Sequence, residues 1–217
     1  LPIGGVSIIV ITVAALTGTL KIGEAISGFA NSAIWLIVGA FLFSRGFIKT
    51  GLGKRIAYNL IAAFGSSSLR LAYALALSDL ILAPATPSNT ARVGGVIMPI
   101  TTSLAKAFGS EPQDGPRKIG SFLMQSIYQV NTITSAMFQT SMAGNTLVAA
   151  LALQSFGIGI TWGDWAMAAI VPGIIALIIM PYFIYKVYPP EIKDAREAQQ
   201  MIKEELKGLG KMSFQEW

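Results

Sequence analysis

The sequence predicts an all-α transmembrane protein in which helical spans accompany a re-entrant helical hairpin and a broken helix. Of its 217 residues, 53% are hydrophobic and 12% are charged, and the mean hydropathy is +0.60. A soluble domain carries about 25% charged residues, so the composition favours a membrane protein. Long uncharged blocks, and two polar interruptions within them, are the other two observations that predict this class.

The composition also excludes several kinds of chemistry. The chain contains no cysteine and no histidine, so it cannot by itself build a Ser-His-Asp triad, a thiolate nucleophile or a Cys/His zinc site. We therefore expect no enzyme. The net charge of +5 comes from basic residues that flank apolar blocks, where they set membrane orientation, and we expect no nucleic-acid partner.

Residues 1–64 are predicted to form two scaffold-type membrane spans and a cytoplasmic amphipathic segment. Blocks 2–20 and 26–44 each hold 19 residues without a charge, and such a helix is about 28 Å long, close to the hydrocarbon thickness. Four basic residues lie in the amphipathic stretch that follows: Arg45, Lys49, Lys54 and Arg55. Because the chain opens at Leu1 in an apolar run, we expect it to be a fragment of a longer protein.

Residues 65–108 are predicted to form the re-entrant hairpin. Two apolar arms, residues 71–82 and 93–105, flank a polar stretch at residues 83–92. Each arm has about a dozen residues, too few to cross the bilayer. Two prolines in the polar stretch disfavour a continuous helix through it, so we expect the chain to turn back.

The distribution of basic residues also favours a hairpin over a full crossing. If the hairpin starts and ends on the cytoplasmic side, every Lys and Arg except Lys21 and Arg92 lies there. A full crossing would place Lys106, Arg117 and Lys118 outside, against the positive-inside rule.

Residues 109–188 are predicted to contain a broken transmembrane helix and a following span. Block 119–156 has 38 residues with a polar middle, whereas one span needs about 20. We expect two half-helices joined by an unwound stretch at residues 140–145, then a span over residues 163–185. Trp162 and Trp165, at one end of that span, are expected to be anchors at the membrane interface. Residues 189–217 predict a polar cytoplasmic linker helix whose one apolar face is solvated or lies at the membrane interface.

A polar hairpin tip and a broken helix in one chain indicate a transport site. Half-helix N-termini attract anions, and unwound carbonyls hold cations. Ser88, Asn89 and Thr90 offer hydroxyls, an amide and backbone N–H groups to carboxylate or phosphate oxygens. The alternative is an ordinary helix cap, because these residue types are common there.

Arg92 is the most costly residue of the chain if it lies at membrane depth. It could pair with a substrate carboxylate or replace a coupling cation. It could equally pair with Asp79, contact a carbonyl, or extend to water. Asp79 could relay protons, or it could serve as a structural ion pair or helix cap.

The second wall of the site is predicted in the unwound stretch. Thr140, Ser141 and Asn145 offer polar groups, and Gly144 permits a close approach. The alternative is that these residues only join packed helices, where small and polar side chains are frequent.

Three segments together resemble the divalent anion–sodium symporter (DASS) family, and most closely its exchanger branch. They are residues 84–95 (PATPSNTARVGG), residues 134–145 (TSAMFQTSMAGN) and residues 188–192 (YPPEI). The branch comprises citrate/succinate antiporters and 2-oxoglutarate/malate translocators. The resemblance covers essentially the whole chain, in order.

The resemblance implies an elevator-type carrier built from two inverted repeats, each with a Ser-Asn-Thr hairpin and a broken helix. Only one such motif is present, so this chain resembles most of the first repeat, and its partners would be the missing C-terminal repeat, membrane lipids and, when full length, a second copy. The predicted substrate-binding residues are Ser88, Asn89, Thr90, Arg92, Thr140, Ser141 and Asn145.

One departure from the family pattern bears on coupling. Pro84 stands where sodium-coupled members carry a hydroxyl ligand, four residues before Ser88. This favours anion exchange, leaves at most a vestigial sodium site at Ser88, Asn89 and Gly144, and leaves Arg92 as a source of positive charge. No other metal or cofactor is expected.

The function we expect is secondary active transport of di- and tricarboxylates such as malate, succinate, 2-oxoglutarate or citrate, by antiport. The alternatives are a sodium-coupled dicarboxylate symporter and a non-transporting membrane fragment or subunit. The expected location is a bacterial inner membrane, with the plastid inner envelope as the alternative.

Overall fold

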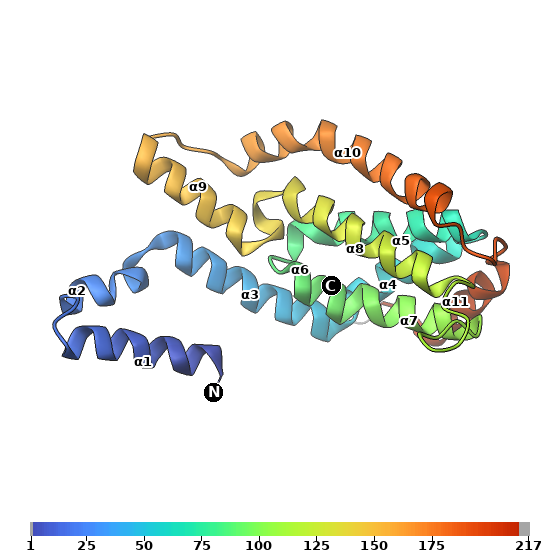
Figure 1. Cartoon of the computed structure of the whole chain (residues 1–217), viewed down its shortest axis with the longest axis horizontal. Helices are drawn as coiled ribbons and strands as arrows, with labels where there is room; N and C mark the ends of the chain where they lie inside the picture. The colour runs from blue at the N-terminus through green and yellow to red at the C-terminus, as the bar shows by residue number, and fades with distance from the viewer. Residues whose placement is uncertain (1, 213–217) are drawn as a thin grey trace. The chain divides into compact units, whose positions relative to one another are not determined.

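The computed structural model describes residues 2–212, and this part of the chain consists of helices, turns and one isolated β-bridge (Figure 1). The predicted all-α class is confirmed. The chain divides into two compact units, Leu1–Gly39 and Ala40–Trp217, and each is described by itself.

The smaller unit contains α1 (Ile3–Leu16), α2 (Ile22–Ala25), the 3-10 turn η1 (Ser27–Ala30) and the first part of α3 (Ser32–Thr50). α1 has 14 residues and is therefore about 21 Å long, so the prediction of a 19-residue span is wrong. The helix ends early because Gly18 has a φ of 71°, the left-handed conformation that closes helix C-termini.

The larger unit begins within α3 and holds the remaining elements. These are α4 (Leu52–Phe64), α5 (Ser68–Leu82), η2 (Ala83–Ala85), α6 (Asn89–Arg92), the π-helix η3 (Val93–Ile97), α7 (Met98–Ala107), α8 (Gly120–Met137), η4 (Gln139–Ser141), α9 (Ala143–Phe156), α10 (Trp162–Val187) and α11 (Arg196–Gly208).

α5 and the continuous helix of α6, η3 and α7 form a hairpin, and the chain reverses between them (Figure 1). The arms are longer than predicted, because Ser67 Oγ accepts the N–H of Arg70 at 3.4 Å and caps α5 upstream of the expected start. With η2, this arm makes an apolar helix of 18 residues, Ser68–Ala85. The prediction of arms too short to span is therefore wrong, and the re-entrant arrangement stays a prediction supported by the basic residues.

The segment between α10 and α11 holds the open end of the hairpin. The N–H of Ser68, at the start of one arm, donates to the carbonyl of Lys193 at 3.0 Å. The N–H of Ile192 donates to the carbonyl of Lys118, in the loop that follows the other arm, at 2.9 Å. The two arms therefore start and finish at the same end of the larger unit, as a hairpin requires.

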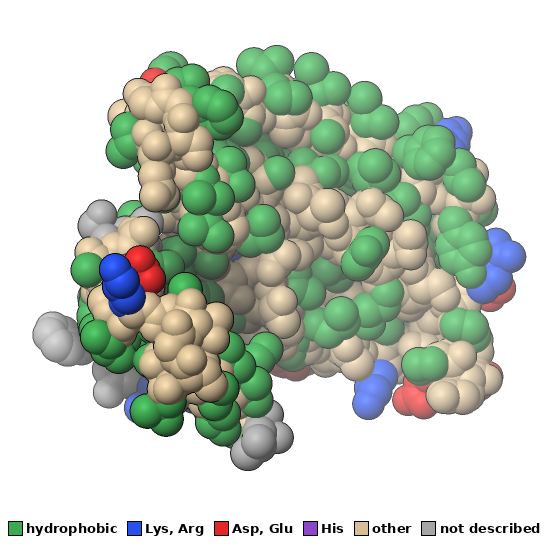
Figure 2. Space-filling view, turned by 60° about the vertical axis from the view of Figure 1, so that its left-hand side comes forward, with side chains coloured by type: hydrophobic (Ala, Val, Ile, Leu, Met, Phe, Trp, Pro, Cys, Tyr) green, Lys and Arg blue, Asp and Glu red, His purple; other side chains and the backbone are tan. Residues whose placement is uncertain are grey.

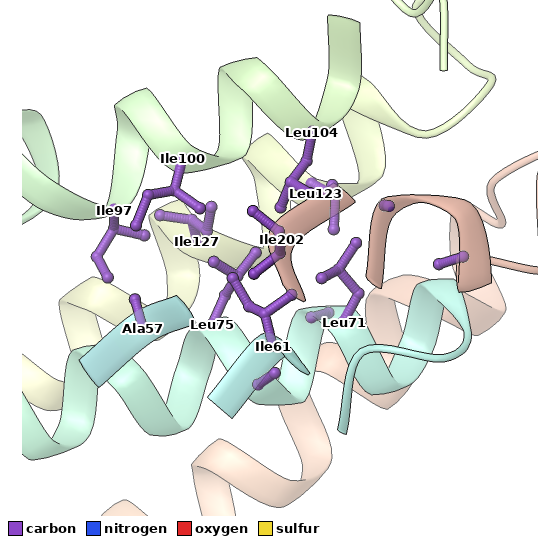
Figure 3. Close-up of a cluster of buried hydrophobic side chains, with 14 of the residues drawn as sticks. Ala57, Ile61, Leu71, Leu75, Ile97, Ile100, Leu104, Leu123, Ile127 and Ile202 are labelled. Atoms are coloured by element: carbon purple, nitrogen blue, oxygen red, sulfur yellow. The ribbon is translucent and has the colours of Figure 1, made fainter. Parts of the chain in front are cut away.

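Buried hydrophobic side chains from α4, α5, α7, α8 and α11 form the core of this unit (Figure 3). The contribution of α11 is notable because its sequence is mostly polar: Ala198 and Ile202 are each 1% exposed. The prediction that the apolar face of the tail is solvated or lies at the membrane interface is therefore wrong, because this face joins the core beside α4 and the hairpin. Such burial of a Leu or Ile side chain stabilises a fold by about 1.5–3 kcal/mol.

Polar contacts fix α11 on α4 beside this core. The Tyr58 hydroxyl donates to the carboxylate of Glu205, and Gln199 Nε2 donates to the carbonyl of Ala62 at 2.8 Å. Burial, followed by the bond to Glu205, raises the pKa of Tyr58, so its hydroxyl stays protonated as a donor.

α10 exposes much of its apolar surface. Its 26 residues extend over about 39 Å, and only 22% of the helix is buried. Its exposed hydrophobic side chains include Met167, Val171, Ile175, Ile178, Ile179 and Phe183. In the view of Figure 2, hydrophobic side chains occupy much of the visible surface of the chain, and charged side chains are few. By length and composition α10 and the helix Ser68–Ala85 are the described helices that could cross a membrane.

Replacing Ile202 by Ala tests whether α11 belongs to the core. We expect the variant to lose about 2–5 kcal/mol of unfolding free energy, because the deleted methyl groups leave a cavity. The measurement is thermal or denaturant unfolding in detergent. Lys203→Ala, on the exposed side of the same helix, is the control and should unfold like the parent; equal stability of the two variants would contradict the packing.

Candidate functional site

The candidate site lies in the larger unit, where the hairpin tip meets the break between α8 and α9. Thr140 Oγ1, in the break, donates to the carbonyl of Pro84, in the tip, at 2.8 Å. Two segments that are more than fifty residues apart in the sequence are thereby joined directly. The resemblance implied that the tip contacts the substrate and that the stretch around residues 140–145 lines the adjoining cation-site region.

The tip owes its shape to two prolines and a cap. Pro84 lies in the 3-10 turn η2, and Pro87 precedes the extended residue Ser88. Ser88 Oγ accepts the N–H of Ala91 at 3.2 Å, so the cap expected as the alternative role of Ser88 is present. Asn89 Oδ1 accepts the N–H of Thr90 at 2.8 Å. Within the described part of the chain, Asn89 Nδ2 has no hydrogen-bond partner, so this donor is available to a ligand.

The helix widens into a π-turn directly after Arg92. Pro99 has no N–H, and its ring excludes the carbonyl of Gly95 from an ordinary helical turn. A π-turn over Val93–Ile97 accommodates this mismatch without breaking the helix. Arg92 is therefore the last residue before the widened turn, and its side chain is fully buried.

All five N–H donors of the Arg92 guanidinium have acceptors. Nε donates to Asp79 Oδ1 at 2.8 Å, and Nη1 reaches the carbonyls of Thr86 at 3.0 Å and Ser141 at 3.2 Å. Nη2 lies 3.1 Å from Ser135 Oγ and 3.4 Å from Thr134 Oγ1, both in α8. The pairing with Asp79 and the carbonyl contact, which were open alternatives, are both present. In this conformation no donor remains for a substrate, and substrate contact by Arg92 stays a prediction.

The other carboxylate oxygen of Asp79 extends the network into α8. Oδ2 accepts a hydrogen bond from the hydroxyl of Thr134 and lies 3.4 Å from Nδ2 of Asn131. Asp79 is 1% exposed. The sequence suggested a pair with Arg92, but the link to α8 could not be anticipated, because Thr134 is 55 positions away.

The helix break spans residues 138–142, so it begins two residues and ends three residues before the predicted stretch 140–145. Carbonyls at the end of α8 lack helical partners. Asn145 Nδ2 donates to those of Ser135 at 2.7 Å and Phe138 at 2.9 Å. Ser141 Oγ lies 2.5 and 2.7 Å from the same two oxygens. Asn145 and Ser141 are both buried, and their contacts match the alternative of polar groups that join helices.

Two tryptophans of α10 also form hydrogen bonds here, one to the break and one to the last turn of α8, which the sequence did not indicate. Trp162 Nε1 donates to Thr140 Oγ1 at 3.0 Å, and its ring stacks on Phe138 with centroids 5.8 Å apart. Trp165 Nε1 donates to the carbonyl of Ala136 at 2.9 Å. We expected interfacial anchors here, because Trp at a helix end is typical of membrane interfaces.

The predicted site residues therefore fall into two groups. Arg92, Ser141 and Asn145 are buried and bound within the protein. The accessible group consists of Ser88, Asn89, Thr140 and Gly144, which are half-buried, and Thr90, which is exposed. The arrangement thus offers an amide, hydroxyls and backbone groups over a fully bonded cation, which suits the oxygens of an organic anion.

Comparison with known proteins places the chain among transporters. The profile of a family described as "Sodium:sulfate symporter transmembrane region" matches residues 1–217. The chain is 56% identical over 211 residues to the "Putative malate transporter YflS" of Bacillus subtilis (strain 168), covering 97% of the chain and 44% of that protein.

Two further relatives come from a plant and a bacterium. "Dicarboxylate transporter 1, chloroplastic" of Spinacia oleracea is 48% identical over 217 residues, which are 100% of the chain and 38% of that protein. "Inner membrane protein YbhI" of Escherichia coli (strain K12) is 48% identical over 199 residues, 92% of the chain and 42% of that protein. The chain spans less than half the length of each of these relatives.

Asn145→Asp tests whether the amide holds the break together. The substitution removes the donor and places a carboxylate against two carbonyls, so we expect a loss of at least about 1–3 kcal/mol, the cost of leaving buried groups unsatisfied. Thermal unfolding in detergent measures it. Asn59→Asp is the control, since Asn59 is exposed and, among the described residues, its side chain bonds only the carbonyl of Arg55 within α4. If both variants unfold alike, the capping role of Asn145 is wrong.

Proposed function

Because the chain belongs to the family of the sodium:sulfate symporter transmembrane region, whose profile covers all of it, we propose that it is part of a membrane carrier for dicarboxylates. The family resemblance is confirmed, and the family is one of transporters, not enzymes. The names of the relatives include a putative malate transporter and a dicarboxylate transporter, which supports this substrate class.

The observation that carries the proposal is the hairpin tip held against the helix break with Asn89 and Thr90 left accessible. In this proposal a substrate carboxylate accepts hydrogen bonds from the Asn89 amide and the Thr90 hydroxyl. Thr140, Ser141 and Asn145 form the second wall, mostly through the backbone that they hold in place. Ser88 shapes the tip by capping its helix.

The rest of the site would come from sequence outside this chain. Since the chain spans less than half of its relatives, we propose that it forms most of the first of two inverted repeats, and that the second repeat completes the pocket. The complete carrier would be multi-pass and homodimeric, with its hairpin re-entrant. A bacterial inner membrane fits the name of the Escherichia coli relative, and a plastid envelope fits that of the spinach one.

We further propose that the carrier works by exchange and needs no sodium. The guanidinium of Arg92 occupies a space lined by two carbonyl, two hydroxyl and one carboxylate oxygen, the ligand types that a hard cation prefers. A tethered cation in this place leaves those oxygens unavailable to sodium. The alternative to exchange is sodium-coupled symport, which the description of the family favours. A sodium ion would then bind at Ser88, Asn89 and Gly144.

Counterflow separates these possibilities. Proteoliposomes that contain the full-length carrier and internal succinate should take up labelled malate in sodium-free buffer, and empty vesicles should not. Added sodium should leave the rate unchanged, because Arg92 already fills the cation position. Uptake that requires sodium would support symport, and no uptake under either condition would favour a non-transporting membrane subunit.

A further inference from the structure

We propose that Asp79 is a specificity-determining residue of this site, because it cancels the charge of Arg92 beneath the hairpin tip and so sets how strongly the site favours anions of higher charge. The inference rests on the proposed function, since it concerns the recognition of carboxylates at the same tip. Asp79 itself is buried and would not touch the substrate.

The two buried charges beneath the tip, on Asp79 and Arg92, neutralise each other. Among the described residues, Asp79 and Arg92 are the only charged side chains that are buried, at 1% and 0% exposure. Asp79 Oδ1 lies 2.8 Å from Arg92 Nε. The pair is thus a dipole with no net charge. Without Asp79, the positive charge of Arg92 would lie only three residues from Asn89, the proposed substrate contact in the same helical segment.

The positions of the two groups do not depend on this ion pair alone. The guanidinium has four further acceptors in the tip, the break and α8, and the Asp79 carboxylate is also held by Thr134 and Asn131. An asparagine at position 79 has the same shape, so its Oδ1 can still accept from Arg92 Nε and its Nδ2 can donate to the Thr134 hydroxyl. The Asn131 amide, whose Nδ2 now lies 3.4 Å from that position, then turns its oxygen toward it. Asp79→Asn therefore changes the charge beneath the tip with little change in geometry.

Electrostatics gives the expected size of the effect. One uncompensated charge at ~10 Å from a substrate charge, in an effective dielectric constant of ~20, changes affinity on the order of tenfold for each unit of substrate charge. A neutral site recognises carboxylates through N–H and O–H dipoles. A site with a net charge adds a contribution to the affinity that grows with each unit of substrate charge.

The test compares succinate with succinamate, in which an amide replaces one carboxylate at nearly the same shape. In sodium-free exchange by the full-length carrier, each is measured as an inhibitor of labelled succinate uptake, and the ratio of the two inhibition constants is compared across variants. Asp79→Asn, with net charge +1 beneath the tip, should increase the preference for succinate on the order of tenfold. Arg92→Gln, with net charge −1, should reduce it by a similar factor.

The double variant Asp79→Asn/Arg92→Gln is the decisive control. It restores net neutrality, so its preference ratio should return to the parent value even if the absolute constants change through lost hydrogen bonds. Neutral replacement of both members of a buried pair is also better tolerated than removal of one, so this variant is expected to fold even if one single variant does not. The single variant that folds then supplies the charged state for the comparison.

Three outcomes overturn the proposal. Equal preference ratios in all folded variants would mean that the pair is purely structural. A double variant that resembles Arg92→Gln would mean that Arg92 itself contacts the substrate. If the parent carrier exchanges no succinate, the proposed function fails first, and the two failures are therefore distinguishable.

Discussion

The buried guanidinium of Arg92 is the interaction on which the rest of the site depends. An unpaired charge in a low-dielectric interior costs several kcal/mol, so the chain must surround it with acceptors. It does so with one carboxylate from α5, two hydroxyls from α8 and two carbonyls. Carbonyls are free to serve only where helices are interrupted, which is why the tip and the break meet at this residue.

Sequence patterns were sufficient to predict most of the longer helices and the breaks between them, but they predicted less well the residues at which those elements begin and end. Uncharged blocks predicted the helices, two prolines predicted the reversal, and the polar middle of a long block predicted the break, because apolar length, missing N–H groups and side-chain polarity are local properties. Boundaries moved where a cap decided them: Ser67 extended α5, and Gly18 shortened α1. The burial of Ile202 depends on where α4 and the hairpin lie, so a polar tail alone could not reveal it.

For the site, the sequence indicated the right segments but not the division of roles among their residues. Ser88, Asn89 and Thr90 stood out because small polar side chains follow prolines in an apolar context. Whether Arg92 faces a substrate or Asp79 depends on contacts across 13 to 49 positions, which no local pattern encodes. For the same reason Trp162 was predicted to lie at an interface, although its N–H bonds Thr140 in the break.

We propose that dicarboxylates bind at the hairpin tip, and the protection of a single cysteine from a thiol reagent tests this site. This chain has no cysteine, so Ala85→Cys in the tip supplies its one thiol for labelling. Any cysteine in the rest of the full-length carrier is first replaced by serine. We expect succinate to slow labelling at Ala85→Cys and to leave the labelling of Ala107→Cys, at the other end of the hairpin, unaffected. Labelling of Ala85→Cys at the same rate with saturating succinate would contradict it.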